Sequence, residues 1–307
     1  MTLLFFEITI IIAFIYLIIG SYTDIRTLEV PDWISYSLIS VGFFFNLILS
    51  FYYNNSQFIL NSLFGFLISL IFGILLYYSG QWGGGDSKVL FGLGSLFGLN
   101  LYSKNFIFSL ENLLNDFYLK FLVNILFMGA IYGFIWIIFM CIKNYRPIIK
   151  ELKINLEDKK FRKIRNLTGL IVIIFILIIN FVKIEAFYYI NPEIKYLLSI
   201  MLILLYLINY LFIFVKSVEK VSMIKEVEPE KLTEGDWIVE DVKVDNIYIT
   251  GPKELGITKE QIQKLIQLKK QGKIDKIKVK YGIPFIPSFL LSLIYTYLTG
   301  RIIIFSI

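Results

Sequence analysis

The chain has 307 residues, of which 57% are hydrophobic and 17% aromatic, and its formal net charge at pH 7 is +6. Apolar runs of near twenty residues recur along most of it, which is typical of a polytopic membrane protein rather than a soluble domain. It has no histidine and a single cysteine, Cys141. This excludes Ser-His-Asp and Cys-His nucleophile systems, H-E-x-x-H zinc sites, Cys-x-x-Cys metal sites and internal disulfides. For a hydrolase, paired carboxylates are then the leading chemistry.

Hydropathy predicts eight membrane-spanning helices. In chain order they cover residues 3–20, 33–51, 58–79, 86–99, 119–142, 167–184, 195–215 and 284–305. The first has no basic start and no cleavage site of small residues, so we expect it to be a retained span and not a signal peptide. The fourth is short and glycine-rich, which leaves open whether it crosses the whole membrane.

The basic residues are concentrated in alternate loops. If the N-terminus faces outside, most of the 30 Lys and Arg residues fall on inner segments, above all 143–166 and 216–283. The positive-inside rule favours this orientation, which puts Asp24 and Asp86 at the cytosolic face. The positive net charge then reflects topology and attraction to anionic membrane lipid, and it does not indicate a nucleic acid partner.

Small residues recur at helical spacing within three spans, which is typical of closely packed membrane helices. They are Gly65, Ser69 and Gly73 in the third span, Gly94 and Gly98 in the fourth, and Gly129 and Gly133 in the fifth. We interpret them as helix-packing seams.

Residues 216–283 form the one sizeable polar stretch of the sequence. Short strands are predicted at 237–239, 247–249 and 277–279. Thr258 is expected to cap a helix, with Gln261 at the capping-box position and Gly272 just past the helix end. The prediction is a small cytosolic α+β domain before the last span, without a recognisable catalytic set and suited to docking or bracing.

Two acidic residues border the apolar spans. Asp24 follows the first span, in a loop, and Asp86 ends the run Gly83-Gly84-Gly85-Asp86 before the fourth. Ionisable groups at membrane depth are costly and usually functional, and consecutive glycines allow a close backbone approach. Facing each other, the two acids would form a carboxylate pair that shares a water.

Each acid also has a purely structural explanation. Asp86 could cap the fourth span at its N-terminus, where an acid suits the helix dipole, although one glycine would then suffice. Asp24 could lie in a solvated turn and pair with Arg26. Glu29 and Asp32 are competing acids in the same loop.

Each acid lies within a short motif, and further motifs lie near the C-terminus. They are Asp24-x-Arg26 with Val30-Pro31-Asp32, Gly83-x-Gly85-Asp86 with Lys88, Ile249-Thr250-Gly251-Pro252, Gly256-Ile257-Thr258 and the stretch from Lys280 to Pro287. Together they resemble the GxGD-type prepilin peptidases, and most nearly the archaeal branch that processes preflagellins (archaellins) and type IV pilin-like precursors. The resemblance covers about residues 1–142 and 216–307. It implies a core of six spans, to which residues 143–215 look like an addition.

The resemblance implies a membrane-embedded aspartyl endopeptidase with Asp24 and Asp86 as the catalytic pair, and no metal or cofactor. Gly83 and Gly85 would support this pair. Lys88 could stabilise the charged pair or extend to the lipid headgroups.

The resemblance also implies the substrate, a precursor with a short basic leader, a glycine at the cut and a hydrophobic helix beyond it. The leader would be removed at the cytosolic membrane face. Glu29 and Asp32 could attract the Lys and Arg residues of the leader, a hypothesis that rests only on their position in the loop. The sequence leaves the oligomeric state open.

Two alternatives stay open. A signal-peptide-peptidase-like protease would cut within a span, but its first acid motif lies inside a span, whereas Asp24 is expected in a loop. A non-enzymatic transporter or assembly platform is the second, although the sequence shows no convincing repeat between its halves. The expected domains are a catalytic membrane core at 1–142, a basic cytosolic loop with two additional spans at 143–215, the α+β domain at 216–283 and a last span at 284–307.

Overall fold

The computed structural model describes residues 3–101, 113, 115–181, 191–245 and 247–303. Within these ranges, 6 helices are long and apolar enough to cross a membrane. They are α1 (Leu3–Thr27), α2 (Asp32–Tyr52), α3 (Gln57–Tyr78), α6 (Phe117–Lys143), α8 (Lys159–Phe181) and α10 (Pro192–Ser222). The predicted fold class, a helical multi-pass membrane protein with a small α+β region before its last helix, is confirmed. The C-terminal ends of the predicted spans 167–184 and 284–305 lie outside the described residues.

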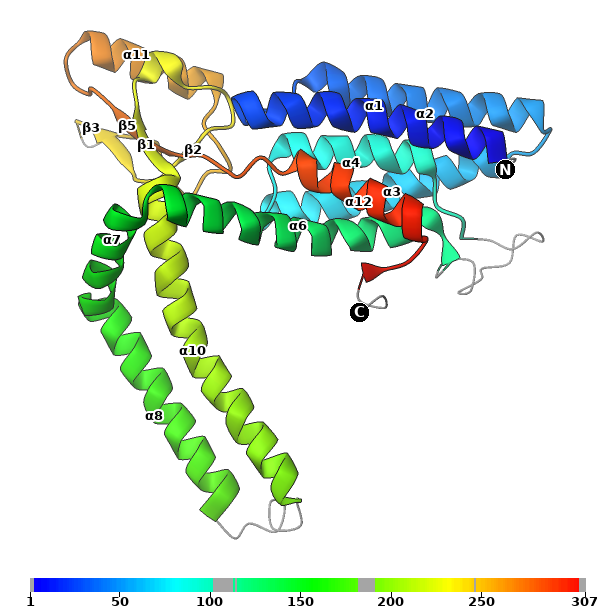
Figure 1. The fold of residues 1–307 in the computed structure, drawn as a ribbon. Helices are drawn as coiled ribbons and strands as arrows, with labels where there is room; N and C mark the ends of the chain where they lie inside the picture. The colour runs from blue at the N-terminus through cyan, green and yellow to red at the C-terminus, as the bar shows by residue number, and fades with distance from the viewer. Residues whose placement is uncertain (1–2, 102–112, 114, 182–190, 246, 304–307) are drawn as a thin grey trace. The chain divides into compact units, whose positions relative to one another are not determined.

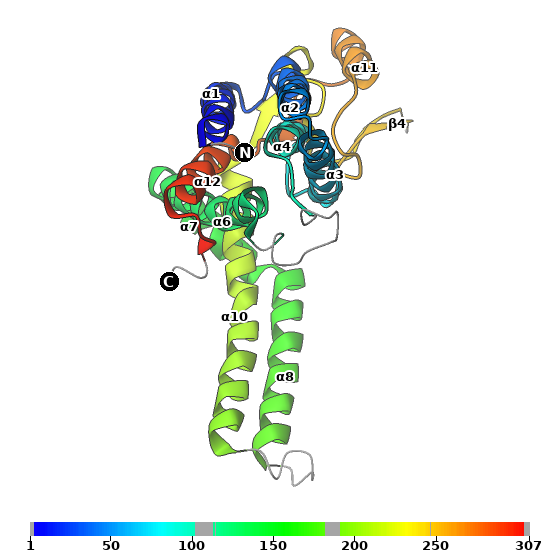
Figure 2. The same ribbon diagram turned by 90° about the vertical axis from the view of Figure 1, so that its right-hand side faces the viewer.

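Two of the eight predicted spans are helices of only 14 residues, α4 (Gly84–Phe97) and α12 (Ile286–Thr299). Each is about 21 Å long, which is less than the roughly 30 Å of a bilayer's hydrocarbon core. α4 ends at Gly98, whose φ of 68° does not continue a right-handed helix. It packs against α2 and α3 and is largely buried from Ser87 to Leu96 (Figure 2). A helix enclosed by protein in this way does not have to reach both lipid boundaries.

The predicted seam of small residues joins α3 to α4 and is confirmed. A Cβ on Gly65 would overlap the carbonyl oxygen of Gly94 and lie 2.8 Å from Cα of Gly98. The Ser87 hydroxyl donates to the carbonyl oxygen of Gly73 at 3.0 Å across the same interface. Any larger residue at these glycines would separate two backbones that are in direct contact.

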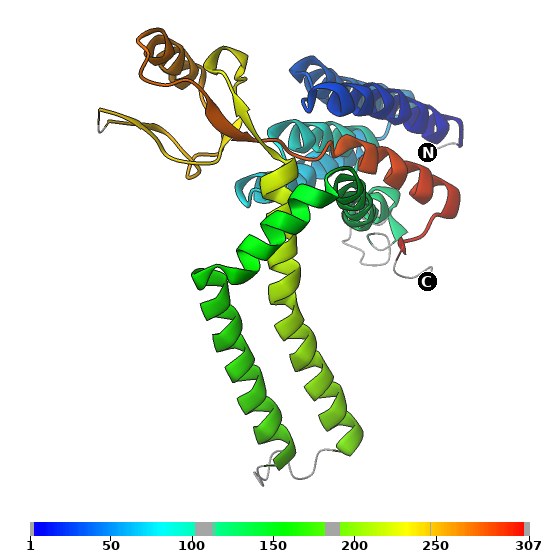
Figure 3. The same ribbon diagram turned by 60° about the vertical axis from the view of Figure 1, so that its left-hand side comes forward.

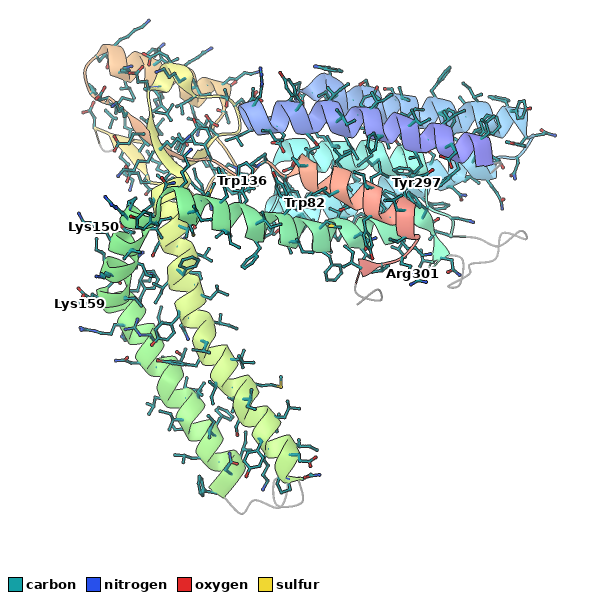
Figure 4. All side chains as sticks on the ribbon, in the orientation of Figure 1. Trp82, Trp136, Lys150, Lys159, Tyr297 and Arg301 are labelled. Carbon is teal, nitrogen blue, oxygen red and sulfur yellow. The ribbon has the colours of Figure 1, made fainter. Side chains whose placement is uncertain are left out.

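α12 is held between α1 and α6 by polar side chains near its C-terminus. Asn124 of α6 donates through Nδ2 to Oγ1 of Thr296 at 2.9 Å and to the carbonyl oxygen of Arg301 at 2.9 Å. Tyr297 donates through its hydroxyl to Glu7 of α1 at 2.8 Å. Figure 4 shows Tyr297 and Arg301 at this end of the helix. These bonds fix the depth of α12 against its neighbours.

The polar stretch before α12 forms a small α+β module (Figure 1). It contains a three-stranded sheet in the order β1-β5-β2 and a two-stranded hairpin of β3 and β4 (Figure 3). The strands are β1 (Ile224–Val227), β2 (Trp237–Ile238), β3 (Val242–Val244), β4 (Ile247–Thr250) and β5 (Ile277–Lys280). The three predicted strands correspond to β2, β4 and β5. β1 and β3 were not predicted; neither contains a buried residue, whereas β2, β4 and β5 each contain at least one.

The helix of this module, α11 (Lys259–Lys270), begins as predicted. The Thr258 backbone N–H donates to Oε1 of Gln261 at 2.9 Å, and the Gln261 backbone N–H donates to Oγ1 of Thr258 at 3.4 Å. Gly272 follows the helix with a φ of 70°. Leu265 from the helix packs with Ile238 and other sheet residues in a core separate from that of the membrane helices.

The chain divides into two compact units, Met1–Trp136 with Glu226–Ile307, and Ile137–Lys225. In the second unit, α7 (Tyr145–Glu157) and α8 both pack against α10. Asn180 of α8 donates to Ser199 of α10 at 3.1 Å, and Asn209 of α10 donates to Thr168 of α8 at 3.1 Å. These bonds pair the two long helices, while most of their aliphatic side chains face outwards, as expected for a lipid-exposed helical hairpin.

Candidate active site

The first of the two acids lies inside a helix, so its predicted loop position is wrong. α1 continues to Thr27 and includes Asp24 near its C-terminal end. The helix ends at Thr27, and the next residue, Leu28, has a φ of 58° and donates its N–H to the carbonyl oxygen of Asp24 at 2.9 Å. Hydropathy falls after Gly20, but the backbone hydrogen bonds do not stop where hydropathy falls. The loop prediction therefore ended the helix too early.

The carboxyl group of Asp24 is held by a distant part of the chain. Asp24 is only 5% exposed, and its Oδ2 accepts a hydrogen bond from the backbone N–H of Ile286 at 2.9 Å. Ile286 is the first residue of α12. An acid near the C-terminus of its own helix is unfavourable, but the free N–H groups at the start of another helix favour a carboxylate. This tertiary contact explains how Asp24 is accommodated.

The second acid, Asp86, lies in the first turn of α4. Its Oδ2 accepts a hydrogen bond from the backbone N–H of Gly83 at 3.0 Å, the capping contact that a structural role predicts. The glycine run also has a packing role. A Cβ on Gly85 would lie 3.1 Å from Cβ of Val30, so a side chain there would press on the segment that links α1 to α2.

The structure brings the two acids together. Asp24 and Asp86 interact electrostatically with each other, and Asp24 also interacts with Tyr132 of α6. Two carboxyl groups in one poorly solvated site do not both ionise easily, so they tend to share a proton. The arrangement can therefore polarise a water molecule with one carboxylate and donate a hydrogen bond from the other carboxyl group.

An aromatic cluster holds the backbone that contacts Asp24. The ring centroid of Trp82 lies 5.4 Å from that of Phe285 and 5.2 Å from that of Phe289, and Figure 4 labels Trp82 beside α12. Phe285 precedes Ile286, and its ring packs on Gly129 of α6, where a Cβ would overlap the ring. The sequence did not assign these residues to the site. The signal was the run from Pro284 to Pro287, together with Gly129, which was interpreted as a packing seam only.

Two cations near the site have partners other than the catalytic candidates. Lys88 forms a salt bridge with Asp32 at 2.6 Å and lies 5.5 Å above the ring of Tyr36. It therefore links the start of α4 to the start of α2. Arg26 does not pair with Asp24 as the structural explanation required; its guanidinium lies 4.8 Å above the ring of Tyr22.

The remaining loop acid, Glu29, is exposed and lies near the α+β module. Burial raises the pKa of Asp236, hydrogen bonds from Thr233 oppose this shift, and the charge of Glu29 adds to it. Burial likewise raises the pKa of Tyr281, and the charges of Asp236 and Glu29 add to that shift. The module thus contributes a second acidic side chain beside Glu29.

The raised pKa of Asp236 predicts how the stability of the module depends on pH. When the pKa of an acid is higher in the folded state than in the unfolded state, ionisation of that acid destabilises the fold. The free energy of unfolding therefore decreases as the pH rises from the unfolded-state pKa, about 3.9 for Asp, through the folded-state pKa. Asp236→Asn keeps an oxygen that can accept from Thr233, so the variant should be more stable than wild type at pH 7 and equally stable near pH 3. Hydrogen exchange of the β5 amides in the full-length protein measures this difference.

The matched control is Asp275→Asn, which changes an exposed acid of the same module and should leave β5 exchange unchanged. Faster exchange in Asp236→Asn than in wild type at pH 7 would mean that the carboxylate stabilises the module and would contradict the prediction.

Comparison with known proteins shows that Asp24 and Asp86 lie in the part of the chain that is similar to a known family. Residues 11–140 match the model of the type IV leader peptidase family. The chain is 34% identical over 133 residues to a preflagellin peptidase of Methanococcus maripaludis, which covers 42% of this chain and 55% of the relative. It is 31% identical over 143 residues to that of Methanococcus voltae, covering 45% of this chain and 59% of the relative.

A third relative, the preflagellin peptidase of Methanocaldococcus jannaschii, is 33% identical over 86 residues, which covers 28% of this chain and 36% of the relative. The chain thus spans between 36% and 59% of the length of these three proteins. Asp24, Gly83, Gly85 and Asp86 all lie within the region that matches the family model. The predicted family resemblance is confirmed.

Proposed function

We propose that this chain, whose residues 11–140 match the type IV leader peptidase family, is a membrane-embedded aspartyl endopeptidase. It would remove the short basic leader from preflagellin (archaellin) or type IV pilin-like precursors. The observation that carries the proposal is the approach of two carboxyl groups from different helices, Asp24 of α1 and Asp86 of α4. Each is anchored by a backbone N–H, so both hold defined orientations.

In the proposed reaction, the ionised member of the pair accepts a proton from the water between them. The water oxygen attacks the scissile carbonyl carbon while the protonated carboxyl group donates a hydrogen bond to the carbonyl oxygen. The tetrahedral intermediate collapses when the leaving amine takes a proton from the pair, and the peptide C–N bond breaks. The proton is shared, so neither Asp24 nor Asp86 is assigned a fixed acid or base role.

The proposed substrate follows from the site's place on the protein. Both acids lie at the ends of helices in the multi-pass core, and the distribution of Lys and Arg favours the cytosolic face for these ends. A precursor with a hydrophobic helix would lie in the bilayer beside the enzyme and present its leader at that face. The relatives in the three methanogens are preflagellin peptidases, which makes an archaellin precursor the first substrate to test.

A role can be proposed for each segment of the chain. The catalytic core would be residues 1–142 together with the last helix at 284–307, because Ile286 contacts Asp24. The α+β module at 216–283 would be cytosolic and brace the site. Residues 143–215 would be accessory, since the family match ends at residue 140.

Glu29 is the better candidate of the two loop acids for contact with a basic leader. It forms no salt bridge within the described parts of the chain, whereas the charge of Asp32 is compensated by Lys88. Glu29→Gln should therefore raise KM about 2- to 5-fold with little change in kcat, as expected for an exposed charge pair. Steady-state cleavage of an archaellin precursor measures both constants.

Asp32→Asn is the matched control, and it should change KM less than Glu29→Gln does. An unchanged KM in both single variants and in the double variant would remove the idea that this loop binds the leader.

The test of the function itself is to mix membranes that contain this protein with an archaellin precursor and to follow leader removal on a gel. Mass spectrometry of the products locates the cut. Cleavage directly before the hydrophobic helix supports the proposal, whereas cleavage within the helix would favour a signal-peptide-peptidase-like protease. Intact archaellin and pilin precursors would instead favour the transporter or assembly-platform alternative.

A further inference from the structure

The second compact unit carries a continuous group of cations that the proposed peptidase function does not use. On α7, three of them lie at helical spacing on one face. Four more follow in the first turns of α8. We call these seven residues the basic face: Arg146, Lys150, Lys153, Lys159, Lys160, Arg162 and Lys163. All seven are exposed, and Figure 4 shows Lys150 and Lys159 on the outer side of their helices.

The opposite side of α7 is fixed against α10. Ile148 is only 3% exposed, and Asn155 donates through Nδ2 to Ser217 at 2.9 Å. Glu151 forms a salt bridge with Lys220 at 2.6 Å. These contacts turn the basic side of the amphipathic helix outwards and set its direction.

A half-buried arginine of α8, Arg165, contacts both α7 and α10. The guanidinium of Arg165 lies 5.4 Å above the ring of Tyr210, and one of its nitrogens donates to the carbonyl oxygen of Leu156 at 3.2 Å. Its Nη1 is buried and has no hydrogen-bond partner among the residues that the structure describes. The contacts of α7 and of Arg165 therefore pre-organise the basic face, and one donor of Arg165 is left unsatisfied.

The charges of the basic face are not neutralised within the described parts of the chain, where none of the seven residues forms a salt bridge. Three acids lie nearby, and one of them, Glu157, is exposed and forms no salt bridge with the seven cations in the described parts of the chain. The other two have other contacts. Glu151 pairs with Lys220, and Asp158 accepts hydrogen bonds from the backbone N–H groups of Lys160 at 2.9 Å and Phe161 at 3.2 Å. A partner with several negative charges would complete this surface.

The position of the basic face along α8 identifies that partner. Shortly after Arg165, α8 becomes mostly apolar, from Leu167 to Phe181. Only 6% of the residues in the apolar stretch of this helix are buried within the protein. An apolar helix exposed in this way faces lipid, so the cations before it lie at the level of the headgroups. We propose that the basic face of the second unit binds the anionic headgroups of the membrane surface and fixes this unit to charged lipid.

The test uses the purified full-length protein in a neutral detergent, titrated with phosphatidylglycerol and, separately, with phosphatidylcholine or glycerol phosphate. Native mass spectrometry measures the lipid-bound fraction. The test variant neutralises α7 (Arg146→Gln, Lys150→Gln, Lys153→Gln). The matched control removes the same charge from exposed lysines of the α+β module (Lys253→Gln, Lys264→Gln, Lys276→Gln).

The expected result is that phosphatidylglycerol binds more tightly than phosphatidylcholine, and that the test variant weakens its binding by about 100-fold. The control variant should keep wild-type binding, and added salt should weaken the wild-type interaction. The side chains changed are exposed, so helix content should not change, and circular dichroism verifies this.

Three results would overturn the proposal. Equal affinity for the two phospholipids would show that the basic face does not select charge. Equal losses in the two triple variants would show that only net charge matters. Binding of glycerol phosphate as tight as that of phosphatidylglycerol would indicate a site for a free phosphate rather than a membrane surface.

Discussion

Asp24→Asn and Asp86→Asn should each lower the rate of leader removal by about 1,000-fold, because neither variant can share a proton across the pair. Asparagine has nearly the same shape, and its amide oxygen can still accept the N–H of Ile286 or of Gly83. The fold should therefore be retained. Cleavage of an archaellin precursor in membranes with equal amounts of each variant measures the effect, and the double variant should lose little more than either single one.

A partly buried acid outside the proposed catalytic pair provides the control for this experiment. Asp116 lies before α6 and accepts the backbone N–H groups of Asn100 at 3.1 Å and Leu119 at 3.0 Å. Asp116→Asn should leave cleavage within a few-fold of wild type. If either Asp24→Asn or Asp86→Asn still cleaves at the wild-type rate, that acid is not catalytic, and Glu29 or Asp32 becomes the next candidate.

Gly129→Ala should lower kcat by about 100-fold with little change in KM, although residue 129 belongs to α6 and bears no catalytic group. A Cβ at this position would overlap the ring of Phe285 and lie 2.9 Å from its Cε2. Phe285 is wedged against Trp82 and directly precedes the N–H that orients Asp24. A displaced ring moves that donor, and a shift of about 1 Å in a catalytic group can cost two orders of magnitude in rate.

Gly133 of the same helix is the matched control, because a Cβ there meets no atom within 4 Å. Gly133→Ala should keep wild-type kcat. Adding Phe285→Leu to Gly129→Ala shortens the side chain that clashes and should recover part of the lost rate. Equal kcat in Gly129→Ala and Gly133→Ala would show that Phe285 does not position Asp24. Thermal unfolding separates this effect from the cost of overpacking, about 1–3 kcal/mol.

The elements that were predicted correctly are those whose signals are local. The long apolar runs specify the six spanning helices, since a backbone in lipid must satisfy its own hydrogen bonds. Thr258 and Gln261 specify the start of α11, because both bonds of a capping box lie within four residues. The glycine seam between α3 and α4 could be predicted for a similar reason, because small residues at helical spacing indicate close helix contact.

The errors arose where a helix boundary or a partner depends on distant residues. α1 continues past the drop in hydropathy to include Asp24, whose carboxylate is compensated by α12. Lys88 had two plausible roles near the acids, and in the structure it pairs with Asp32 on the start of α2. Gly129 and Gly133 look equivalent in the sequence, yet only Gly129 faces an aromatic ring.

The amino-acid sequence was thus sufficient for the membrane class, the α+β module and the choice of Asp24 and Asp86 as candidate catalytic residues. Only the tertiary structure showed that the N–H of Ile286, 262 positions away, holds Asp24, and that Phe285, Trp82 and Gly129 hold that N–H. The physical reason is that hydropathy, capping and motif spacing act over a few residues, whereas the contacts of a side chain depend on which helices pack together. That packing is set by the shapes of many side chains at once, and no local pattern encodes it.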